Sequence, residues 1–292
     1  MKVFVYGTLL KGMSRAHSLA SATFCGLGEI KASLYDLGAY PGIVEGDGTV
    51  YGELYDVDAT TLKTLDDIEG YFQNNPRLSL YLRTEVEVTL FNDATTETAY
   101  TYLYNSRHLD NYVYIESGDY RRYKLDNKQA WYIAYGSNMS SKRILERIGH
   151  VDEPLLGYLD GFELVFNKQG DNGSAYANIK YRGPGYRCPF AAYVISPRQL
   201  QKLDGCVGES VHYVRVGLPF KATDHIGKEE VNDNAGHANS TSIHQTISFN
   251  TQRLGHIYIA HPNKLTEIAR PTEQYLNHLR TGYREFGFEV NF

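Results

Sequence analysis

Short stretches of alternating apolar and polar residues recur along the chain, and this period of two predicts β-strands with one buried and one solvated face. The clearest example runs from Tyr81 to Phe91. Its apolar face carries Val86, Val88 and Leu90, and its polar face carries Glu85, Glu87 and Thr89. Further strands are expected at 2–6, 49–57, 98–104, 162–166, 175–181, 190–195, 211–218 and 256–260. Strands therefore predominate in the predicted fold.

Three segments have helical spacing instead. The first follows the capping residue Asp58 and is ended by Gly70, a residue type that favours the backbone of a helix stop. The second follows the capping residue Ser196 and has Pro197 in its first turn, where a missing N–H costs nothing. The third covers 271–287, and its apolar stripe indicates a helix that packs on the fold and takes no part in catalysis.

Two blocks of sequence occur twice in the same order. Residues 3–9 carry a strand into a Tyr-Gly turn, as do residues 132–138, and the helix block 57–70 aligns without a gap with 195–208. The second copy has about nine more residues between its blocks than the first. A duplication with a loop insertion explains this repeat.

The repeat predicts two domains, residues 1–126 and 127–292, each long enough to enclose a core. The boundary lies in the stretch 120–129, which is charged and short of apolar residues, so we expect a linker there. The segment 223–245 has no counterpart in the first copy and is expected to be an extended surface loop. No metal site is assigned, because three histidines of this loop match no regular ligand spacing. They are His225, His237 and His244.

Composition excludes several classes of protein. The net charge is −5 and Lys and Arg form no cluster, which argues against a nucleic-acid or anionic-membrane partner. The three cysteines are scattered and are expected to be reduced, mostly buried thiols. The N-terminus lacks a signal-peptide core and no stretch reaches the length of a membrane span. We therefore expect a cytoplasmic protein, and a monomer, because a duplicated chain can bury within itself the surface that a single domain buries by pairing.

The Tyr-Gly turn is the first candidate for chemistry. A strand that ends in this way leaves the N–H groups of Gly7, Thr8 and Leu9 without partners in the sheet, and such groups can converge on an anion. The second copy has the same turn at Tyr135, Gly136, Ser137 and Asn138, followed by a helix start. The alternative is that the glycine merely permits a tight turn at the edge of the sheet.

Glu69 is the second candidate. It stands at a helix C-terminus beside two aspartates, where the helix dipole and like charges raise the pKa of a partly buried carboxyl and so make it a useful proton shuttle near neutral pH. An exposed, inert carboxylate is the alternative. The second copy has Val207 at the aligned position, which cannot move a proton. Glu209 is a possible replacement, with Asp204 and His212 weaker ones.

These blocks together resemble the γ-glutamyl cyclotransferase-like superfamily. In the first copy the resemblance lies in residues 4–9, 65–70 and 80–86, and is closest to γ-glutamylamine cyclotransferase and the plant avirulence-induced-gene-like branch. In the second copy residues 134–139, 159–164 and the closing helix resemble the γ-glutamylcyclotransferase branch. The resemblance implies an α+β fold of two tandem domains, each a small mixed β-barrel flanked by helices, with the turn and the glutamate facing one cavity.

The resemblance also implies a reaction in which the α-amine of a γ-glutamyl group attacks its own γ-carbonyl, forming 5-oxoproline and expelling an amine, with no metal or organic cofactor. Glu69 would carry the protons, the turn Gly7-Thr8-Leu9 would hold a carboxylate or oxyanion, and Tyr6 would shape the wall. The turn Tyr135-Gly136-Ser137-Asn138 would bind a carboxylate without acting on it. Two alternatives stand beside this hypothesis: a non-catalytic module that binds a metabolite or a partner protein, and a related acyl transfer on a specialised γ-glutamyl-protected metabolite.

Overall fold

The computed structural model describes residues 1–105, 111–223, 251–290 and 292, so the predicted loop 223–245 and its histidines lie almost wholly outside the described residues. The first half contains β1 (Lys2–Val5), η1 (Ala16–Leu19), β2 (Thr23–Asp36), β3 (Pro41–Asp56), α1 (Ala59–Ile68), η2 (Pro76–Leu78), β4 (Tyr81–Leu90), β5 (Thr96–Tyr104), β6 (Val113–Tyr114) and α2 (Tyr120–Leu125). The second half contains β7 (Ala130–Ala134), η3 (Ser137–Met139), α3 (Ser141–Ile148), β8 (Leu155–Asp160), β9 (Phe162–Gln169), β10 (Ala175–Tyr181), β11 (Arg187–Ile195), α4 (Pro197–Val207), β12 (Tyr213–Phe220), β13 (Arg253–Ala260), η4 (Pro262–Lys264) and α5 (Glu273–Glu285).

Five strands of the first half close into a barrel. Antiparallel pairs join β1 to β3, β3 to β2, β2 to β4 and β4 to β5, and a parallel contact between Val3 and Tyr100 returns from β5 to β1. Apolar side chains fill the interior, among them Phe4, Ile43 and Leu54. The barrel is mixed because its closing pair is parallel.

The second half repeats this order of strands. Its sheet runs β12-β13-β7-β11-β8, and β7 lies parallel to β13. A bridge between Gly157 and Ala222 brings the free edge of β8 against the end of β12, and Thr223 donates its backbone N–H to the carbonyl of Leu156 at 2.9 Å. A separate hairpin, β9 and β10, extends from this sheet. Both halves therefore have the predicted α+β fold, a small mixed barrel with helices against it.

Local sequence accounts for most of these elements. Asp58 caps α1 by accepting a hydrogen bond from the backbone N–H of Thr61 at 2.7 Å, and Ser196 caps α4 in a capping box with Gln199, as predicted. In β4 the predicted alternation is confirmed, with Val88 buried and Glu87 exposed. The strand β2 was not predicted, because its glycines and mixed polarity hide any period of two.

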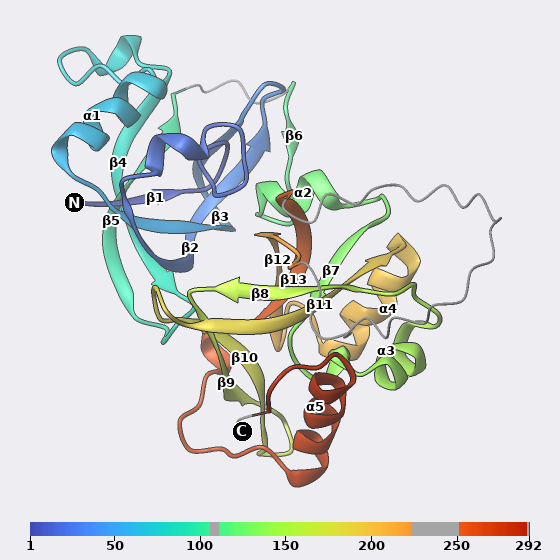
Figure 1. Cartoon of the computed structure of the whole chain (residues 1–292). Coiled ribbons are helices and arrows are strands. Elements are labelled where there is room, and N and C mark those ends of the chain that lie inside the picture. The colour runs from blue at the N-terminus through green and yellow to red at the C-terminus, as the bar shows by residue number, and fades with distance from the viewer. Residues whose placement is uncertain (106–110, 224–250, 291) are drawn as a thin grey trace, which may run out of the picture.

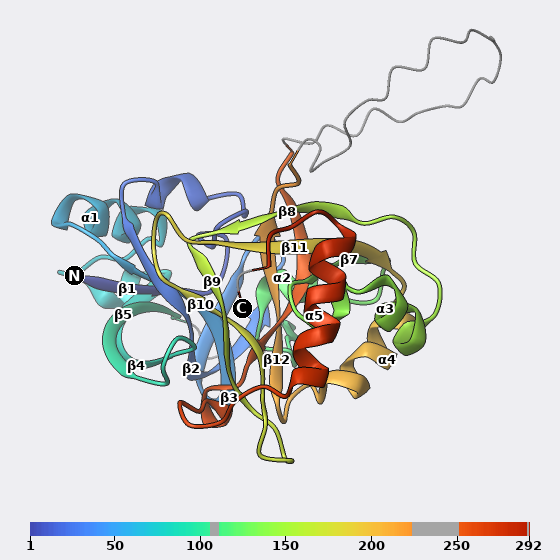
Figure 2. The same ribbon diagram turned by 60° about the horizontal axis from the view of Figure 1, so that its bottom comes forward.

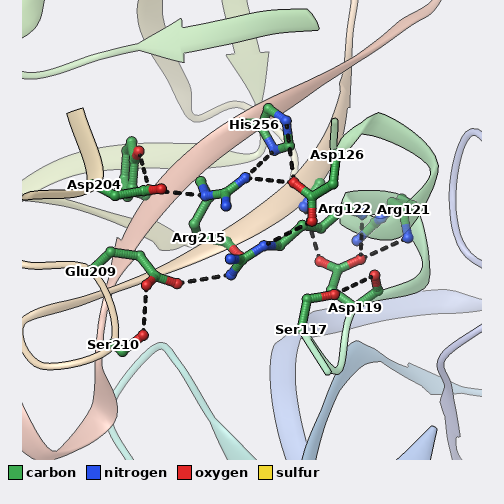
Figure 3. Close-up of polar contacts among 12 residues, drawn as sticks. Ser117, Asp119, Arg121, Arg122, Asp126, Asp204, Glu209, Ser210, Arg215 and His256 are labelled. Carbon is green, nitrogen blue, oxygen red and sulfur yellow. Dashed lines mark hydrogen bonds and ion pairs between the residues drawn. The ribbon is translucent and has the colours of Figure 1, made fainter. Parts of the chain in front are cut away.

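The predicted linker is wrong in part, because residues 120–125 form helix α2 and dock on the second half (Figure 1). Asp119 caps this helix, and its second carboxylate oxygen accepts the backbone N–H of Gly217 at 2.9 Å. Arg122 donates to Glu209 at 2.8 Å, and Arg215 of the second half donates to Asp126 at 2.8 Å (Figure 3). The charged residues at 119–126 therefore form contacts between the halves, and this stretch is not a free, solvated linker.

Apolar side chains also cross between the halves. Leu27 and Phe91 of the first half belong to a buried cluster that is otherwise built from the second half. The ring of Phe24 meets that of Tyr181 edge-on with 4.6 Å between centroids, and the backbone N–H of Tyr181 donates to Asn92 at 2.9 Å. Figure 2 shows β9 and β10 beside the strands of the first barrel, while α3, α4 and α5 gather on the side of the molecule opposite α1. The two barrels thus share part of one core.

Two further expectations bear on the class of protein. Among the described residues, no helix has both the length and the apolar character that crossing a membrane requires. The cysteines are free thiols, but only Cys188 is buried, whereas Cys25 is half-buried and Cys206 is exposed. The expectation of mostly buried thiols is therefore wrong, because Cys206, in the last turn of α4, is exposed and Cys25 is only half-buried.

Candidate active site

A small cavity of about 60 Å³ lies in the first half between the Tyr-Gly turn and the C-terminal end of α1. The end of β1 and the turn after it form one wall, and Glu69 and Ile68 form another. Tyr40, at the end of the connection between β2 and β3, also lines it, together with Pro41 of β3 and Tyr81 of β4. The predicted turn and the predicted glutamate therefore line one cavity.

The turn presents the backbone donors that the sequence predicted. Within the described residues, the N–H groups of Gly7, Thr8 and Leu9 donate to no protein acceptor, although the carbonyls of Gly7 and Thr8 accept from residues further along the loop. Gly7 is required for steric reasons, because a Cβ there would stand 2.6 Å from Cγ of Pro41. Three adjacent N–H groups at a cavity wall can hold a carboxylate or a developing oxyanion.

Glu69 is the residue that ends α1, and Gly70 turns the chain away with a left-handed φ of 61°. Its side chain is partly buried in the cavity wall. Burial raises the pKa of the Glu69 carboxyl to about 7, and the nearby Arg15 guanidinium opposes this shift. The direction agrees with the sequence-based expectation, but the cause is loss of solvation and not the neighbouring aspartates.

Asp66 does not contribute to this shift because its charge is engaged elsewhere. Its carboxylate accepts hydrogen bonds from the Arg83 guanidinium at 2.5 Å and from the Tyr102 hydroxyl at 2.9 Å. The other neighbour, Asp67, is exposed. Glu69 is thus the one acid among the residues that line this cavity.

Two tyrosines that line the cavity fix its walls by donating hydrogen bonds to backbone carbonyls. The Tyr6 hydroxyl donates to the carbonyl of Tyr102 at 2.7 Å, and the Tyr81 hydroxyl donates to the carbonyl of Pro41 at 2.7 Å. Burial raises the pKa values of both phenols well above their ordinary range, so both remain donors at neutral pH. Sequence reasoning found Tyr6 but missed Tyr81 and Arg15, since neither lies in a repeated block and only folding brings them to the turn.

The second half reproduces both tyrosine contacts. The Tyr135 hydroxyl donates to the carbonyl of Tyr258 at 2.6 Å, and the Tyr213 hydroxyl donates to the carbonyl of Ala177 at 2.8 Å. The N–H groups of the turn Gly136-Ser137-Asn138 donate to no acceptor within the described part of the chain. A cavity of about 650 Å³ opens at this turn. The preserved turn therefore again faces a cavity.

The acid, however, is not reproduced. Val207 lines the second cavity at the end of α4, as Glu69 lines the first at the end of α1. Glu209 is absent from the lining residues, because its carboxylate accepts from Arg122 across the interface between the halves (Figure 3). Asp204 accepts from Tyr258 at 2.7 Å and pairs with Arg215 at 3.0 Å, in the manner of Asp66. Of the three possible replacements, only His212 lines the cavity, where its ring contacts Asp171 at 3.1 Å.

The arrangement in the first half suits a reaction that develops negative charge on oxygen and moves one proton. The turn supplies fixed N–H donors, and a carboxyl whose pKa is about 7 can accept and return a proton at neutral pH. The second half keeps the donors but has Val207 where the first half has Glu69. Among the described residues, the combination of the turn with a glutamate at the neighbouring helix end is therefore found in the first cavity and not in the second.

A family model and several known proteins match the first half of this chain. The family model described as "Gamma-glutamyl cyclotransferase, AIG2-like" matches residues 3–122. The gamma-L-glutamyl-butirosin B gamma-glutamyl cyclotransferase of Niallia circulans is 34% identical over 127 residues, which are 43% of this chain and 78% of that protein. The gamma-glutamylcyclotransferase family protein YtfP of Escherichia coli K12 is 36% identical over 121 residues, which are 41% of this chain and 96% of that protein.

One similar protein extends over both halves. YkqA of Bacillus subtilis is 28% identical over 204 residues, which are 65% of this chain and 70% of that protein. Its crystal structure aligns with a TM-score of 0.69 at 23% sequence identity, covering 98% of this chain and 94% of YkqA. The arrangement of two successive barrels is therefore a fold that this chain shares with a solved structure.

Proposed function

The chain belongs to the γ-glutamyl cyclotransferase family, and we propose that its first half cyclises the γ-glutamyl group of a small substrate to 5-oxoproline with Glu69 as the proton carrier. In this proposal residues 1–126 form the catalytic domain and residues 127–292 a second domain without the catalytic glutamate. The observation that carries it is a carboxyl of raised pKa in the same cavity as three unpaired N–H groups.

The reaction needs little catalytic equipment because its two reacting groups belong to one molecule. The α-amine of the substrate attacks its own γ-carbonyl carbon, a C–N bond forms, and the carbonyl oxygen becomes an oxyanion. Effective molarities of ~10⁵ M or more are known for well-oriented reactions of this kind. Holding the substrate in the ring-closing conformation therefore supplies much of the rate.

The Tyr-Gly turn is proposed to hold the substrate in this conformation. The N–H groups of Gly7, Thr8 and Leu9 would bind the glutamyl carboxylate or the oxyanion, and fixed donors of this type need no reorganisation during the reaction. Tyr6 forms part of the wall, and its hydroxyl is already committed to Tyr102. Arg15 also lines the cavity, where its charge favours an anionic substrate.

Proton transfer is the role proposed for Glu69. The attacking nitrogen must lose a proton, and the leaving nitrogen must gain one before its bond to the γ-carbon breaks. A carboxyl with a pKa of about 7 is suited to both steps near neutral pH. The ionised form accepts the first proton, and the neutral form returns it, so Glu69 ends the cycle as it began.

The cavity of about 60 Å³ is smaller than a γ-glutamyl compound requires. Tyr40 and Pro41 line it where the connection between β2 and β3 enters β3, so this segment would have to shift when substrate enters. The name of the Niallia circulans relative places γ-L-glutamyl-butirosin B among the compounds to be tested.

The decisive experiment compares the wild type with Glu69→Gln. Both proteins are incubated with γ-glutamyl amino acids, γ-glutamyl amines, glutathione and γ-L-glutamyl-butirosin B, and 5-oxoproline is followed by mass spectrometry. We expect release by the wild type and a loss of at least 100-fold in the variant, since the amide keeps the shape of the side chain but cannot carry the proton.

Asp67→Asn is the matched control, because it removes an exposed acid from the same helix end and should keep wild-type turnover. Equal release by the wild type and Glu69→Gln would remove Glu69 from the mechanism. If neither protein releases 5-oxoproline while substrates still bind, the first half is a binding module and the proposal is wrong.

A further inference from the structure

The cavity of the second half is far larger than that of the first, about 650 Å³ against about 60 Å³. The Tyr-Gly turn, the end of α4, the tip of the hairpin β9–β10 and helices α3 and α5 all contribute to its lining. Helix α5, which the sequence suggested was for packing alone, reaches it through Tyr275. A space of this size accommodates a metabolite.

Three cationic side chains line this cavity: Arg143, Arg147 and Lys168. Lys168 is only 4% exposed, and within the described residues its ammonium group makes no hydrogen bond or ion pair, although the charge of Asp171 acts on it from further away. The Nε atom of Arg143 is likewise buried without an acceptor. A cation that is buried without a hydrogen-bond acceptor is costly, so an anion that entered the cavity would relieve that cost.

The acids of the lining do not balance these charges. Among the described residues, Asp171 is the one acid that lines the cavity, and its carboxylate already contacts the ring of His212 at 3.1 Å. Arg147 donates to the neutral amide oxygen of Asn138 at 2.6 Å, which leaves its positive charge uncompensated. Three positive side chains and one negative side chain leave an excess of two positive charges, which matches a ligand with two negative charges.

Aromatic rings form much of the remaining wall. Six tyrosines line the cavity: Tyr132, Tyr135, Tyr176, Tyr213, Tyr258 and Tyr275. The Lys168 ammonium lies over the rings of Tyr176 and Tyr213, 5.1 Å and 5.3 Å from their centroids. These rings hold the ammonium in place at the wall of the cavity, and burial lowers the pKa of Lys168. The site is thus built around a fixed cation.

We propose that the second half binds a small dianion, a dicarboxylate or a phosphate monoester, in this cavity and does not transform it. Arg143, Arg147 and Lys168 would contact the negative groups, and the N–H groups of the turn would add neutral donors. Val207 leaves the site without a counterpart of the Glu69 carboxyl and also removes a charge that would repel the ligand. The proposal is independent of catalysis in the first half.

The test is isothermal titration calorimetry on the full chain with four probes: succinate, glutarate, inorganic phosphate and glucose 6-phosphate. Acetate serves as the monoanionic control. We expect at least one dianion to bind at least tenfold more tightly than acetate, and its identity separates the dicarboxylate from the phosphate source. Lys168→Met and Arg143→Gln should each weaken that binding at least tenfold.

Arg198→Gln is the matched control, since Arg198 is exposed on α4 away from the cavity and should leave binding unchanged. Arg143 is only partly buried, so Arg143→Gln decides the question if Lys168→Met fails to fold. The proposal is overturned if the wild type binds no probe, if acetate binds as tightly as the dianions, or if binding survives both cavity substitutions.

Discussion

The Arg122 guanidinium donates to the Glu209 carboxylate at 2.8 Å, and this contact joins helix α2 of the first half to the turn that follows α4 in the second. The Ser210 hydroxyl donates to the other carboxylate oxygen at 2.6 Å. Both oxygens of Glu209 are therefore engaged outside the second cavity. Glu209, two residues beyond the end of α4, therefore belongs to the interface between the halves and does not take the place of Glu69.

Glu209→Gln should consequently affect stability and not turnover. Loss of the charge weakens a half-buried ion pair, and we expect the free energy of unfolding to fall by about 1–3 kcal/mol. Release of 5-oxoproline should stay within about twofold of the wild type under conditions where both proteins are folded. Urea unfolding and the mass-spectrometric assay measure the two quantities. A variant of unchanged stability that lost activity would contradict this assignment.

The pH dependence of kcat/KM should follow the Glu69 carboxyl. The ionised form is the proton acceptor, so kcat/KM should rise with pH through a midpoint near 7. Because Arg15 lowers this pKa, Arg15→Gln should move the midpoint to higher pH, whereas Arg15→Lys should keep it near the wild-type value. Rates across pH 5 to 9 give the midpoint, and a profile unchanged by Arg15→Gln would refute the coupling.

Glu69 should also make stability depend on pH. Its folded pKa of about 7 lies above the ordinary value of 4.5, so the folded state binds more protons between these values. The stability that this proton contributes is present below pH 4.5 and is lost as the pH rises through 7.

Glu69→Gln has no carboxyl at this position to titrate, so it does not lose this stability as the pH rises. The free energy of unfolding of the variant minus that of the wild type should therefore increase by about 2–3 kcal/mol between pH 4.5 and 8. Urea denaturation at fixed pH values measures the difference. Asp67→Asn, which changes an exposed side chain, should differ from the wild type by no more than about 0.5 kcal/mol throughout. A constant difference for Glu69→Gln would show that its carboxyl titrates normally.

The two Tyr-Gly turns should tolerate a methyl group differently. A Cβ at Gly7 would stand 2.6 Å from Cγ of Pro41, whereas a Cβ at Gly136 would stand 3.2 Å from Cβ of Ala177. Gly7→Ala should therefore displace the turn, destabilise the protein by about 1–3 kcal/mol and lower turnover at least tenfold. Gly136→Ala should cost less than about 1 kcal/mol and leave turnover intact. Similar effects of both substitutions would rule out this steric account.

Much of the fold was predictable because its signals are local. The caps Asp58 and Ser196 and the alternation around Val88 act within a few residues of themselves. The strand β2 escaped prediction because its long pairing with β3 compensates for a weak local pattern. Likewise, residues 120–125 are charged in sequence but fold as a helix, because Asp119 and Arg122 find partners in the second half.

Only some residues of the candidate sites could likewise be predicted from the sequence. Gly7 and Glu69 could be found because their blocks occur twice, and the second copy marks Glu69 by replacing it with Val207. Arg15, Tyr81 and Lys168 could not, since each comes from an element whose position is set by the closed barrels and not by nearby sequence. The raised pKa of Glu69 was expected, but its cause depends on burial that only the fold creates.

The docking of α2 limits how this chain can be divided for engineering. A cut after Asp126 would leave the Asp119 carboxylate without Gly217 and the Arg122 guanidinium without Glu209. It would also uncover the apolar surface of Leu27 and Phe91, which favours aggregation of an isolated barrel. Grafts and chimaeras that keep the first barrel will need either the whole duplicated chain or a redesigned polar surface in place of the second barrel.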